Sequence, residues 1–568
     1  MMVLTFLNTA VLCVVPFVKI YATSEFINVS ISIVTTGASM AYVIMPAVLL
    51  VITIGYGYLE RSLLGIVWLK IGAALRETFG LMQMKKTAML EYKHIENPQT
   101  LDLIRRTSDD GQRIVEVCQV FYHAVIILSQ ILSVFVIVMT VSALTGLVLL
   151  VISVPLLYIA MKAGEIRYDA EREITKYKRQ YEYINEVASG RDTADERTLF
   201  EYGPAIKKRW HVSYEEFRKR DIRAIFNKNL HLEGGSIITA MLTIIIAAFL
   251  LVLYYQGKMD IGLYLSIMVN VITLIETMSW SFSGTISEMT NNHQYLKDVD
   301  AYFKLSEEEG VLDEADSREQ IQTVEFKNVR FKYPGSDYYV LNGFSMKMGR
   351  GKHYACVGAN GAGKTTVVKL LTGLYRDYEG SILINGKELR EYPPCELRSM
   401  FAIVYQDYSR YQVSLRDNIK FGNMRCGESE IMDAINKIDL GHVVEKFEHG
   451  LDTPLGKILE GGQDISGGEW QKIALARLLV NKNAVQILDE PTAALDPIME
   501  NKVYENFSKI SRDRTTLFIS HRLGSTMLAD IIFVIDRGLV AECGSHAELM
   551  KNGTIYKEMY TSQKGWYE

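Results

Sequence analysis

The sequence predicts two fused domains, an all-α membrane domain of six spanning helices followed by an α/β domain. Three long runs without Asp, Glu, Lys or Arg, at 26–59, 117–161 and 234–257, place the membrane domain in the first half of the 568 residues. After residue 324, short apolar runs of β type alternate with helical patterns, which is typical of an α/β domain. The composition agrees, because 49% hydrophobic and 22% charged residues lie between the values of soluble and membrane proteins.

The charge-free runs define the spans. A spanning helix needs about 20 apolar residues, because the hydrocarbon core is about 30 Å thick and each residue rises about 1.5 Å. The run 117–161 is too long for one span and fits two. We expect six spans at about 1–21, 36–60, 115–141, 144–165, 234–256 and 262–284. A secretory signal is the alternative for the first, but that segment lacks a positive start, and Lys19 follows where a cleavage motif should begin.

The distribution of Lys and Arg predicts the orientation. Both are frequent in 61–113 and 162–228, whereas the loops 22–39 and 256–262 carry only Lys258. The positive-inside rule therefore places the long segments, both termini and the C-terminal domain of this multi-pass protein in the cytoplasm. The long charged segments are nearly free of Gly and Pro and show helical spacing, so we expect the spanning helices to extend into the cytoplasm, with bends near Asn97-Pro98 and Ser189-Gly190.

An acidic stretch separates the two domains. We expect a transmembrane domain at 1–305, a linker at 306–321 and the α/β domain at 322–568. The linker contains Glu307, Glu308, Glu309, Asp313, Glu314, Asp316 and Glu319. Like charges repel and stay exposed, which predicts a solvated linker rather than a binding site.

Charge and cysteine usage exclude other classes. The net charge is −5, without the basic footprint that nucleic-acid binding requires, so no nucleic-acid partner is expected. The six cysteines form no CxxC pair, which argues against a disulfide scaffold and a cysteine zinc site.

A glycine-rich turn carries the first chemical motif. It reads Gly-Ala-Asn-Gly-Ala-Gly-Lys-Thr at 358–365, between a strand-like run at 353–357 and a helical run at 366–374. This is the context of a phosphate-binding loop, whose glycines let backbone N–H groups approach phosphates at a helix N-terminus. Lys364 would hold the β- and γ-phosphates, and Thr365 would ligate Mg²⁺. The nucleotide-binding residues predicted here are Gly358, Asn360, Gly361, Gly363, Lys364, Thr365 and Thr366.

Two further segments complete the predicted nucleotide site. The apolar run 485–488 ends in Asp489 and Glu490, which suits a buried strand that brings Asp489 to the metal. Glu490 could orient and deprotonate the attacking water; the alternative is a helix-capping pair before Pro491. Ser466, Gly467, Gly468 and Glu469 open a helical run and offer a second phosphate site at its N-terminus, although this pattern equally fits a flexible N-cap.

With these motifs, the chain resembles the ATP-binding-cassette (ABC) exporters, as a half-transporter with six spans fused to one nucleotide-binding domain. The resemblance covers essentially the whole chain and implies ATP and Mg²⁺ as cofactors. It implies that Tyr333 stacks on adenine, although an edge-strand aromatic is the alternative. It also implies roles for four other residues: Gln406 senses Mg²⁺, Glu460 contacts the cytoplasmic loops, Asp496 links the two sites of a dimer, and His521 holds the γ-phosphate.

The family mechanism implies a dimer. The segment 466–469 of one copy completes the ATP site of the other, and closure and hydrolysis switch the cavity between inward- and outward-facing states. Two departures from the family pattern stand at Ile465 and Glu469, where the family most often has Leu and Gln. Glu469 adds a negative charge near phosphates. Because Glu490 and His521 are present, we expect a competent site and a homodimer, with a heterodimer as the alternative.

The cargo is less specifically indicated. The stretch 404–411 and the ending 562–567 resemble bacterial exporters of lantibiotics and other modified peptides that lack a peptidase domain. A peptide is therefore the first expectation, and a lipid or an amphiphilic drug follows. A non-transporting regulator is a weaker alternative, because Glu490 is present.

Three residues of the sixth span are candidates for the substrate pathway. An ionisable group at bilayer depth is costly and usually faces a cavity or a partner. Glu276 could therefore line the pathway and favour cationic cargo; the alternatives are that it lies low enough to snorkel toward the membrane surface or that it pairs with another helix. Asn270 and Trp280 are further candidates that helix packing explains equally well.

Overall fold

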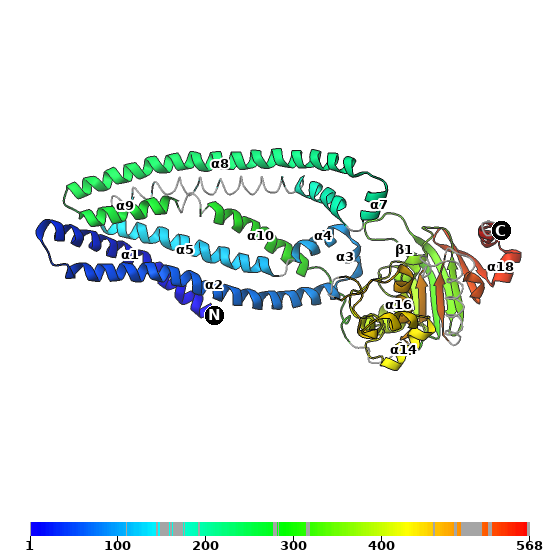
Figure 1. Cartoon of the computed structure of the whole chain (residues 1–568). Coiled ribbons are helices and arrows are strands. Elements are labelled where there is room, and N and C mark those ends of the chain that lie inside the picture. Colours follow the sequence, from blue (N-terminus) through cyan, green and yellow to red (C-terminus); the bar gives the residue numbers. More distant parts are fainter. Residues whose placement is uncertain are drawn as a thin grey trace. The chain divides into compact units, whose positions relative to one another are not determined.

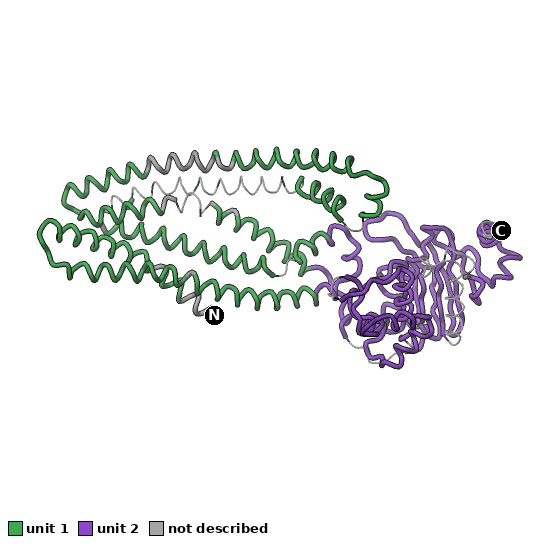
Figure 2. Tube along the Cα trace, in the orientation of Figure 1, with its two compact units in different colours: residues 1–84, 102–304 green, residues 85–101, 305–568 purple. Residues whose placement is uncertain are grey.

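The computed structural model divides the chain into two compact units. The helical unit comprises residues 1–84 and 102–304, and the α/β unit comprises residues 85–101 and 305–568 (Figure 2). The description leaves out residues 1, 109–110, most positions between 142 and 176, 191–192, 277–280, 282, 314–318, 458–460, 482–484, 490–513, 521–524 and 565–568. The division joins the short segment 85–101 to the α/β unit, although in sequence it lies between two parts of the helical unit.

Long helices make up the helical unit (Figure 1). They are α1 (Met2–Thr36), α2 (Ala41–Met89, whose last residues belong to the α/β unit), α4 (Pro98–Thr107, which begins in that unit), α5 (Gln112–Val141), α7 (Ala194–Leu199), α8 (Gly203–Tyr255), α9 (Ile261–Glu276) and α10 (Ser283–Phe303). Among the described residues, Ala10–Thr36, Ala41–Met89 and Gln112–Thr140 are long and apolar enough to cross a membrane, and Thr243–Tyr255 and Ile261–Thr273 are shorter apolar helices. The predicted all-α membrane class is confirmed, and α2 continues from its apolar part into a charged extension.

Close packing of α9 on α1 helps to form the core of the helical unit. The backbone N–H of Gly262 donates to Asn28 Oδ1 at 2.8 Å, and a Cβ at Gly262 would lie 2.2 Å from the carbonyl oxygen of Ser24. The buried hydroxyl of Ser266 donates to the carbonyl of Ile20 at 2.8 Å. Small residues allow such close approach between membrane helices, where hydrogen bonds add to packing. The surrounding core contains Ile20, Val134, Val138, Ile246, Leu250, Ile267 and Val271.

Two sheets organise the α/β unit. The first is antiparallel with the order β2-β1-β4-β5, from β1 (Thr323–Phe331), β2 (Leu341–Gly349), β4 (Glu379–Ile384) and β5 (Lys387–Glu388). The second has the order β10-β9-β3-β8-β7-β6, from β3 (His353–Val357), β6 (Phe401–Val404), β7 (Val485–Asp489), β8 (Thr516–Ile519), β9 (Ile531–Asp536) and β10 (Leu539–Gly544). Its strands pair in parallel except for β10, so their carboxyl ends share one edge. The central strands β3, β7 and β8 are fully buried, which explains their continuous apolar runs.

Helices complete this unit. They are α3 (Tyr92–Glu96), α11 (Lys364–Leu371), α12 (Pro394–Ser399), α13 (Leu415–Lys420), α14 (Glu428–Lys437), α15 (Gly441–Lys446), α16 (Gly467–Leu479), α18 (His546–Asn552) and α19 (Ile555–Lys564), with short 3₁₀ turns at Leu389–Glu391, Gly450–Asp452 and Ser525–Leu528. One hydrophobic core contains α11 and both sheets. A second core packs α13 to α16 against residues of β3, β6, β7, β8 and β9. The predicted α/β class is confirmed.

The acidic linker makes specific contacts with neighbouring parts of the α/β unit. Lys86 Nζ lies 2.5 Å from Glu307 Oε1 and donates to the carbonyl of Leu305 at 2.7 Å. Glu308, whose side chain is only 14% exposed, pairs with Arg376 and Arg398. The prediction of a solvated linker is therefore wrong for Glu308, because two arginines far away in the sequence neutralise it. The side chain of Glu307 is exposed, as predicted, although it pairs with Lys86.

Candidate nucleotide site

The glycine-rich turn lies where β3 meets α11. Gly363 is the N-cap of α11 and has φ of +104°, and a Cβ there would lie 2.7 Å from Leu341 Cδ2. At Gly358, a Cβ would lie 2.2 Å from the carbonyl oxygen of Ile535. Gly363 requires glycine because of its positive φ, and Gly358 requires it because the backbone carbonyl of Ile535 leaves no room for a side chain. The buried Lys364 Nζ donates to the carbonyls of Gly358 at 2.8 Å and Ala359 at 3.0 Å, which closes the loop around the helix N-terminus.

A cavity of about 580 Å³ opens at this turn. Its lining includes residues predicted from separate motifs, namely Tyr333, Asn360, Gly361, Gly363, Lys364, Thr365, Thr366 and Gln406, together with Tyr338 and Val340. The lining thus combines the glycine-rich turn and the side chains of Lys364 and Thr365, which suit a triphosphate and Mg²⁺, with the aromatic residue Tyr333, which suits a base. The residues present therefore fit a magnesium nucleotide.

Asp489 lies at the same edge of the parallel sheet as the turn. It pairs in register with Ile519 of β8, and Ile519 pairs with Cys356 of β3. Asp489 is therefore two strands away from Cys356, which lies just before the turn. With about 4.8 Å between strands, this separation is roughly 10 Å. Asp489 is only 4% exposed. Leu488, which precedes Asp489, pairs in register with Val404 at the end of β6, so Asp489 lies beside the segment that leads to Gln406. Burial raises the pKa of Tyr405 in this segment, and the charge of Asp489 raises it further.

The segment around Ser466 forms a capped helix N-terminus. Ser466 Oγ accepts a hydrogen bond from the backbone N–H of Glu469 at 3.3 Å, and Glu469 Oε2 accepts one from the backbone N–H of Ser466 at 2.7 Å. This reciprocal pair is a capping box at the start of α16. Burial alone would raise the pKa of Glu469, but the hydrogen bonds from Ser466 outweigh it and hold that pKa below its usual value. The charge of Glu469 is therefore directed at its own helix terminus.

Two residues that the sequence analysis did not single out for a site role connect its parts. Tyr408 donates its hydroxyl to the carbonyl of Gly467 at 2.9 Å, which joins the segment after Gln406 to the start of α16. Arg477 of α16 donates to the carbonyls of Ser409 at 2.8 Å and Asn418 at 2.9 Å. Burial lowers the pKa of Arg477. No local pattern marks either residue, because their partners lie about 60 positions away.

Several predicted site residues are not placed. Glu460, Glu490, Asp496, His521 and Trp280 lie outside the described residues. Glu276 ends α9, but its side chain is also outside the description. Asn270 is half-buried and donates to the carbonyl of Ser266 on its own helix at 2.8 Å. The structure thus brings together the glycine-rich turn, Gln406 and Tyr333.

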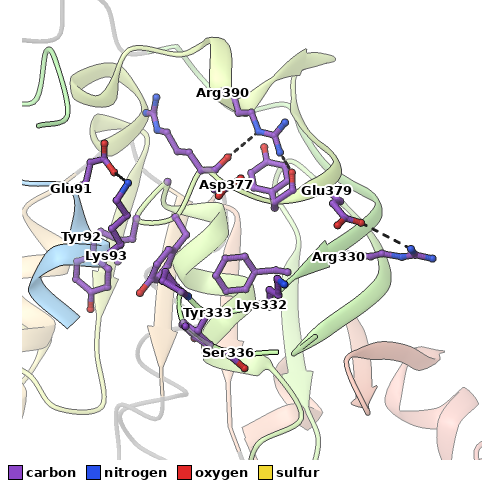
Figure 3. Close-up of a pocket in the computed structure, with 18 of the residues that line it drawn as sticks. Glu91, Tyr92, Lys93, Arg330, Lys332, Tyr333, Ser336, Asp377, Glu379 and Arg390 are labelled. Carbon is purple, nitrogen blue, oxygen red and sulfur yellow. Dashed lines mark hydrogen bonds and ion pairs between the residues drawn. The ribbon is translucent and has the colours of Figure 1, made fainter. Parts of the chain in front are cut away.

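A second, larger cavity of about 1060 Å³ also has Tyr333 in its wall (Figure 3). It is lined in part by Tyr92 and Lys93 of α3, by Lys332 and by Tyr375. Tyr333 therefore forms part of the wall of both cavities. The sequence analysis missed this arrangement, because α3 is more than 200 positions from Tyr333.

Comparisons with known proteins agree with this geometry. The family model described as ABC transporter matches residues 341–493. The subtilin transport ATP-binding protein SpaT of Bacillus subtilis is 30% identical over 97% of this chain and 89% of its own length. The nisin transport ATP-binding protein NisT of Lactococcus lactis subsp. lactis is 26% identical over 98% of this chain and 92% of its own. A solved bacterial Atm1-family ABC exporter with ATP bound aligns over 98% of both chains with a TM-score of 0.81 at 21% identity.

Proposed function

The chain belongs to the ABC transporter family as an ATP-driven exporter, and we propose that its cargo is a peptide. The two relatives that match nearly the full chain are named for the transport of subtilin and nisin. The segment 404–411, which resembles peptide exporters, contains both Gln406 and Tyr408 and is therefore part of the nucleotide site. The proposed direction is from the cytoplasm across the plasma membrane, with both termini in the cytoplasm.

Hydrolysis would use the residues gathered at the edge of the parallel sheet. Lys364 would hold the β- and γ-phosphates, and Thr365, Gln406 and Asp489 would hold Mg²⁺ directly or through water. Bound Mg²⁺ would neutralise charge that develops on the phosphates. Glu490 follows Asp489 in sequence and would orient and deprotonate the attacking water. His521, two positions after β8, would hold the γ-phosphate.

We assign the adenine to Tyr333. Its ring forms part of the cavity wall that also contains Lys364 and Thr365. Its hydroxyl lies 2.9 Å from Thr366 Oγ1, which anchors the ring relative to the phosphate-binding turn. Stacking on such a ring contributes about 0.5–1.5 kcal/mol.

The second half of the site would come from another copy. The start of α16, with Ser466, Gly467 and Gly468, presents a helix N-terminus for the γ-phosphate of the partner's nucleotide. Asp496 would link the two sites, and Glu460 would contact the cytoplasmic loops of the membrane domain. ATP would then close a dimer, and closure would switch the membrane cavity between inward- and outward-facing states.

The cavity shared by Lys364, Thr365, Gln406 and Tyr333 is the observation that carries this proposal. The test is ATP turnover by the full chain in nanodiscs, with and without a cationic amphipathic peptide. We expect the peptide to stimulate turnover, and Glu490→Gln to reduce turnover by about 10²–10⁴-fold while ATP still binds. Turnover that no peptide alters would contradict a peptide cargo. Full turnover in Glu490→Gln would contradict the assigned base.

Glu276 is the residue proposed to favour a cationic cargo. Glu276→Gln removes one charge with little change in shape. The stimulation by a lysine-containing peptide should then fall toward that of the same peptide with acetylated lysines. Equal stimulation of parent and variant would show that Glu276 does not select charge.

A further inference from the structure

A short helix in the first charged hairpin contacts the base side of the nucleotide domain. Helix α3, Tyr92–Glu96, belongs to the α/β unit, and two residues separate it from the end of α2. The helix ends before Asn97, its C-cap residue. The side-chain oxygen of Asn97 accepts a hydrogen bond of 2.9 Å from the backbone N–H of Gln99, at the start of α4. The position of Glu96 is therefore determined by the bend between two helices.

Glu96 holds two residues on or just after the helix of the phosphate-binding turn. Its carboxylate pairs with the ammonium of Lys369 on α11 and accepts a hydrogen bond from the hydroxyl of Tyr375. The side chains of Lys369 and Glu96 are 16% and 32% exposed, and Tyr375 is buried. Burial alone would raise the pKa of Glu96, but the hydrogen bonds from Lys369 and Tyr375 lower it, so the carboxylate stays ionised. Charge-assisted bonds of this kind are stronger than neutral ones.

Lys369 and Tyr375 in turn contact the aromatic ring of Tyr333. Lys369 Nζ lies 5.4 Å from the ring centroid of Tyr333 and 5.6 Å from that of Tyr92, within the range of cation–π attraction. Tyr375 meets Tyr333 edge to face, with centroids 5.5 Å apart and planes at 85°. Phe331 adds another edge contact at 5.1 Å. Tyr333 thus has its hydroxyl anchored to Thr366 and its ring packed by residues that Glu96 holds.

We propose that Glu96 is a positioning residue for the base of the nucleotide, and that it acts through Lys369 and Tyr375 on the ring of Tyr333. This inference rests on the proposed stacking of adenine on Tyr333. Glu96 does not line the nucleotide cavity, so its effect reaches the base only through other side chains. The binding contribution of the base depends on Glu96, whereas that of the triphosphate, held by Lys364 and the glycine-rich turn, does not.

A purely structural contact makes a different prediction from a positioning role. If Glu96 only stabilised the packing of α3, its loss would weaken all ligands equally through the fold. If it positions Tyr333, its loss weakens only ligands that carry a base. Magnesium ATP and magnesium tripolyphosphate separate these cases, because they share the phosphates and differ in the nucleoside.

The test measures the affinity of both probes by calorimetry, with the full chain in nanodiscs and Glu490→Gln present in every variant to stop turnover. Glu96→Gln should weaken ATP binding about five-fold and leave tripolyphosphate binding within about two-fold. The matched control is Glu91→Gln, because Glu91 directly precedes the same helix and pairs with Lys93 instead. It should change neither affinity. Melting temperatures verify that each variant is folded.

A double-mutant cycle tests the route through the ring. Tyr333→Ala alone should reduce the ratio of ATP affinity to tripolyphosphate affinity. Glu96→Gln added to Tyr333→Ala should reduce this ratio no further. Equal weakening of both probes by Glu96→Gln, unchanged ATP binding, or additive losses in the cycle would each overturn the inference. If Tyr333→Ala leaves this ratio unchanged, the stacking assignment fails and this inference fails with it. The assignment of the phosphates to Lys364 would be unaffected.

Discussion

The hydroxyl of Tyr408 donates a hydrogen bond of 2.9 Å to the backbone carbonyl of Gly467. Tyr408 is two residues from Gln406, which lines the nucleotide cavity, and Gly467 is the first residue of α16. The bond joins the proposed Mg²⁺ sensor of one site to the segment that would complete the site of a second copy. Arg477, two residues before the end of α16, reinforces this joint through the carbonyl of Ser409.

Removing the Tyr408 hydroxyl should uncouple these two segments. Tyr408→Phe keeps the ring and removes one hydrogen bond, which contributes about 0.5–1.5 kcal/mol. We expect the maximal rate of ATP hydrolysis to fall several-fold, with ATP affinity nearly unchanged, because the cavity lining is intact. The control is Tyr411→Phe, which also removes a hydroxyl but keeps the ring that contacts Phe421 and Arg477. Equal rates for parent and Tyr408→Phe would contradict the coupling role.

The charge of Glu469 should weaken the closure of two copies around ATP. Glu469→Gln preserves a capping box, which accepts Glu or Gln at this position, and removes a negative charge near the site of phosphate binding. We expect the apparent affinity for ATP to rise about three-fold at low ionic strength, with a smaller gain at high salt. ATPase titrations at two salt concentrations measure this change. A gain that is equal at both would argue against an electrostatic cause.

Gly363 should tolerate no side chain. Gly363→Ala places a Cβ 2.7 Å from Leu341 Cδ2 on a backbone with φ of +104°, which costs on the order of 1–3 kcal/mol. We expect a lower melting temperature and more than ten-fold weaker ATP binding. Gly427→Ala is the matched control, since Gly427 is also a helix N-cap but has φ of −82° and open space around it. Because Ala is a poorer N-cap than Gly, Gly427→Ala should still cost about 0.5–1 kcal/mol, but without backbone strain.

Glu542 should contribute stability that depends on pH. Burial opposes its ionisation, but the backbone N–H groups of Tyr556, Ile555 and Thr554 outweigh that effect and lower its pKa. Because the folded pKa lies below the unfolded value of about 4.3, the stabilisation is complete above that value and is lost as the pH falls through the folded pKa.

Glu542→Gln should therefore lower the free energy of unfolding at pH 7 by about 1 kcal/mol. The effect is this small because solvent screens a partly exposed carboxylate. The difference from the parent should shrink as the pH falls from 5 to 3. Thermal melts of the detergent-solubilised chain across this range measure it. The control is Glu558→Gln, on the exposed side of α19, which should change little. A difference that stays constant with pH would exclude the carboxylate as its source.

The sequence predicted the local elements on which the proposed site is built. The motif at 358–365 identified the turn between β3 and α11, and the apolar run before Asp489 identified a buried strand. Such motifs are readable because each one is local, and its spacing along the chain is set by the strand or helix that carries it. The same holds for the apolar parts of the long helices, which are long enough to cross a membrane.

By itself, the sequence determined the helical and α/β classes, the family and the glycine-rich turn that is proposed to bind phosphates. Only the tertiary structure decided which distant side chains meet: Glu96 with Lys369 and Tyr375, Tyr408 with Gly467, and Glu308 with Arg376 and Arg398. A local pattern records the period of an element, but a pairing across 60 to 280 positions leaves no period in the chain. These contacts arise when the two sheets and the hairpin helix pack around common cores, and there the orientation of Tyr333 is set.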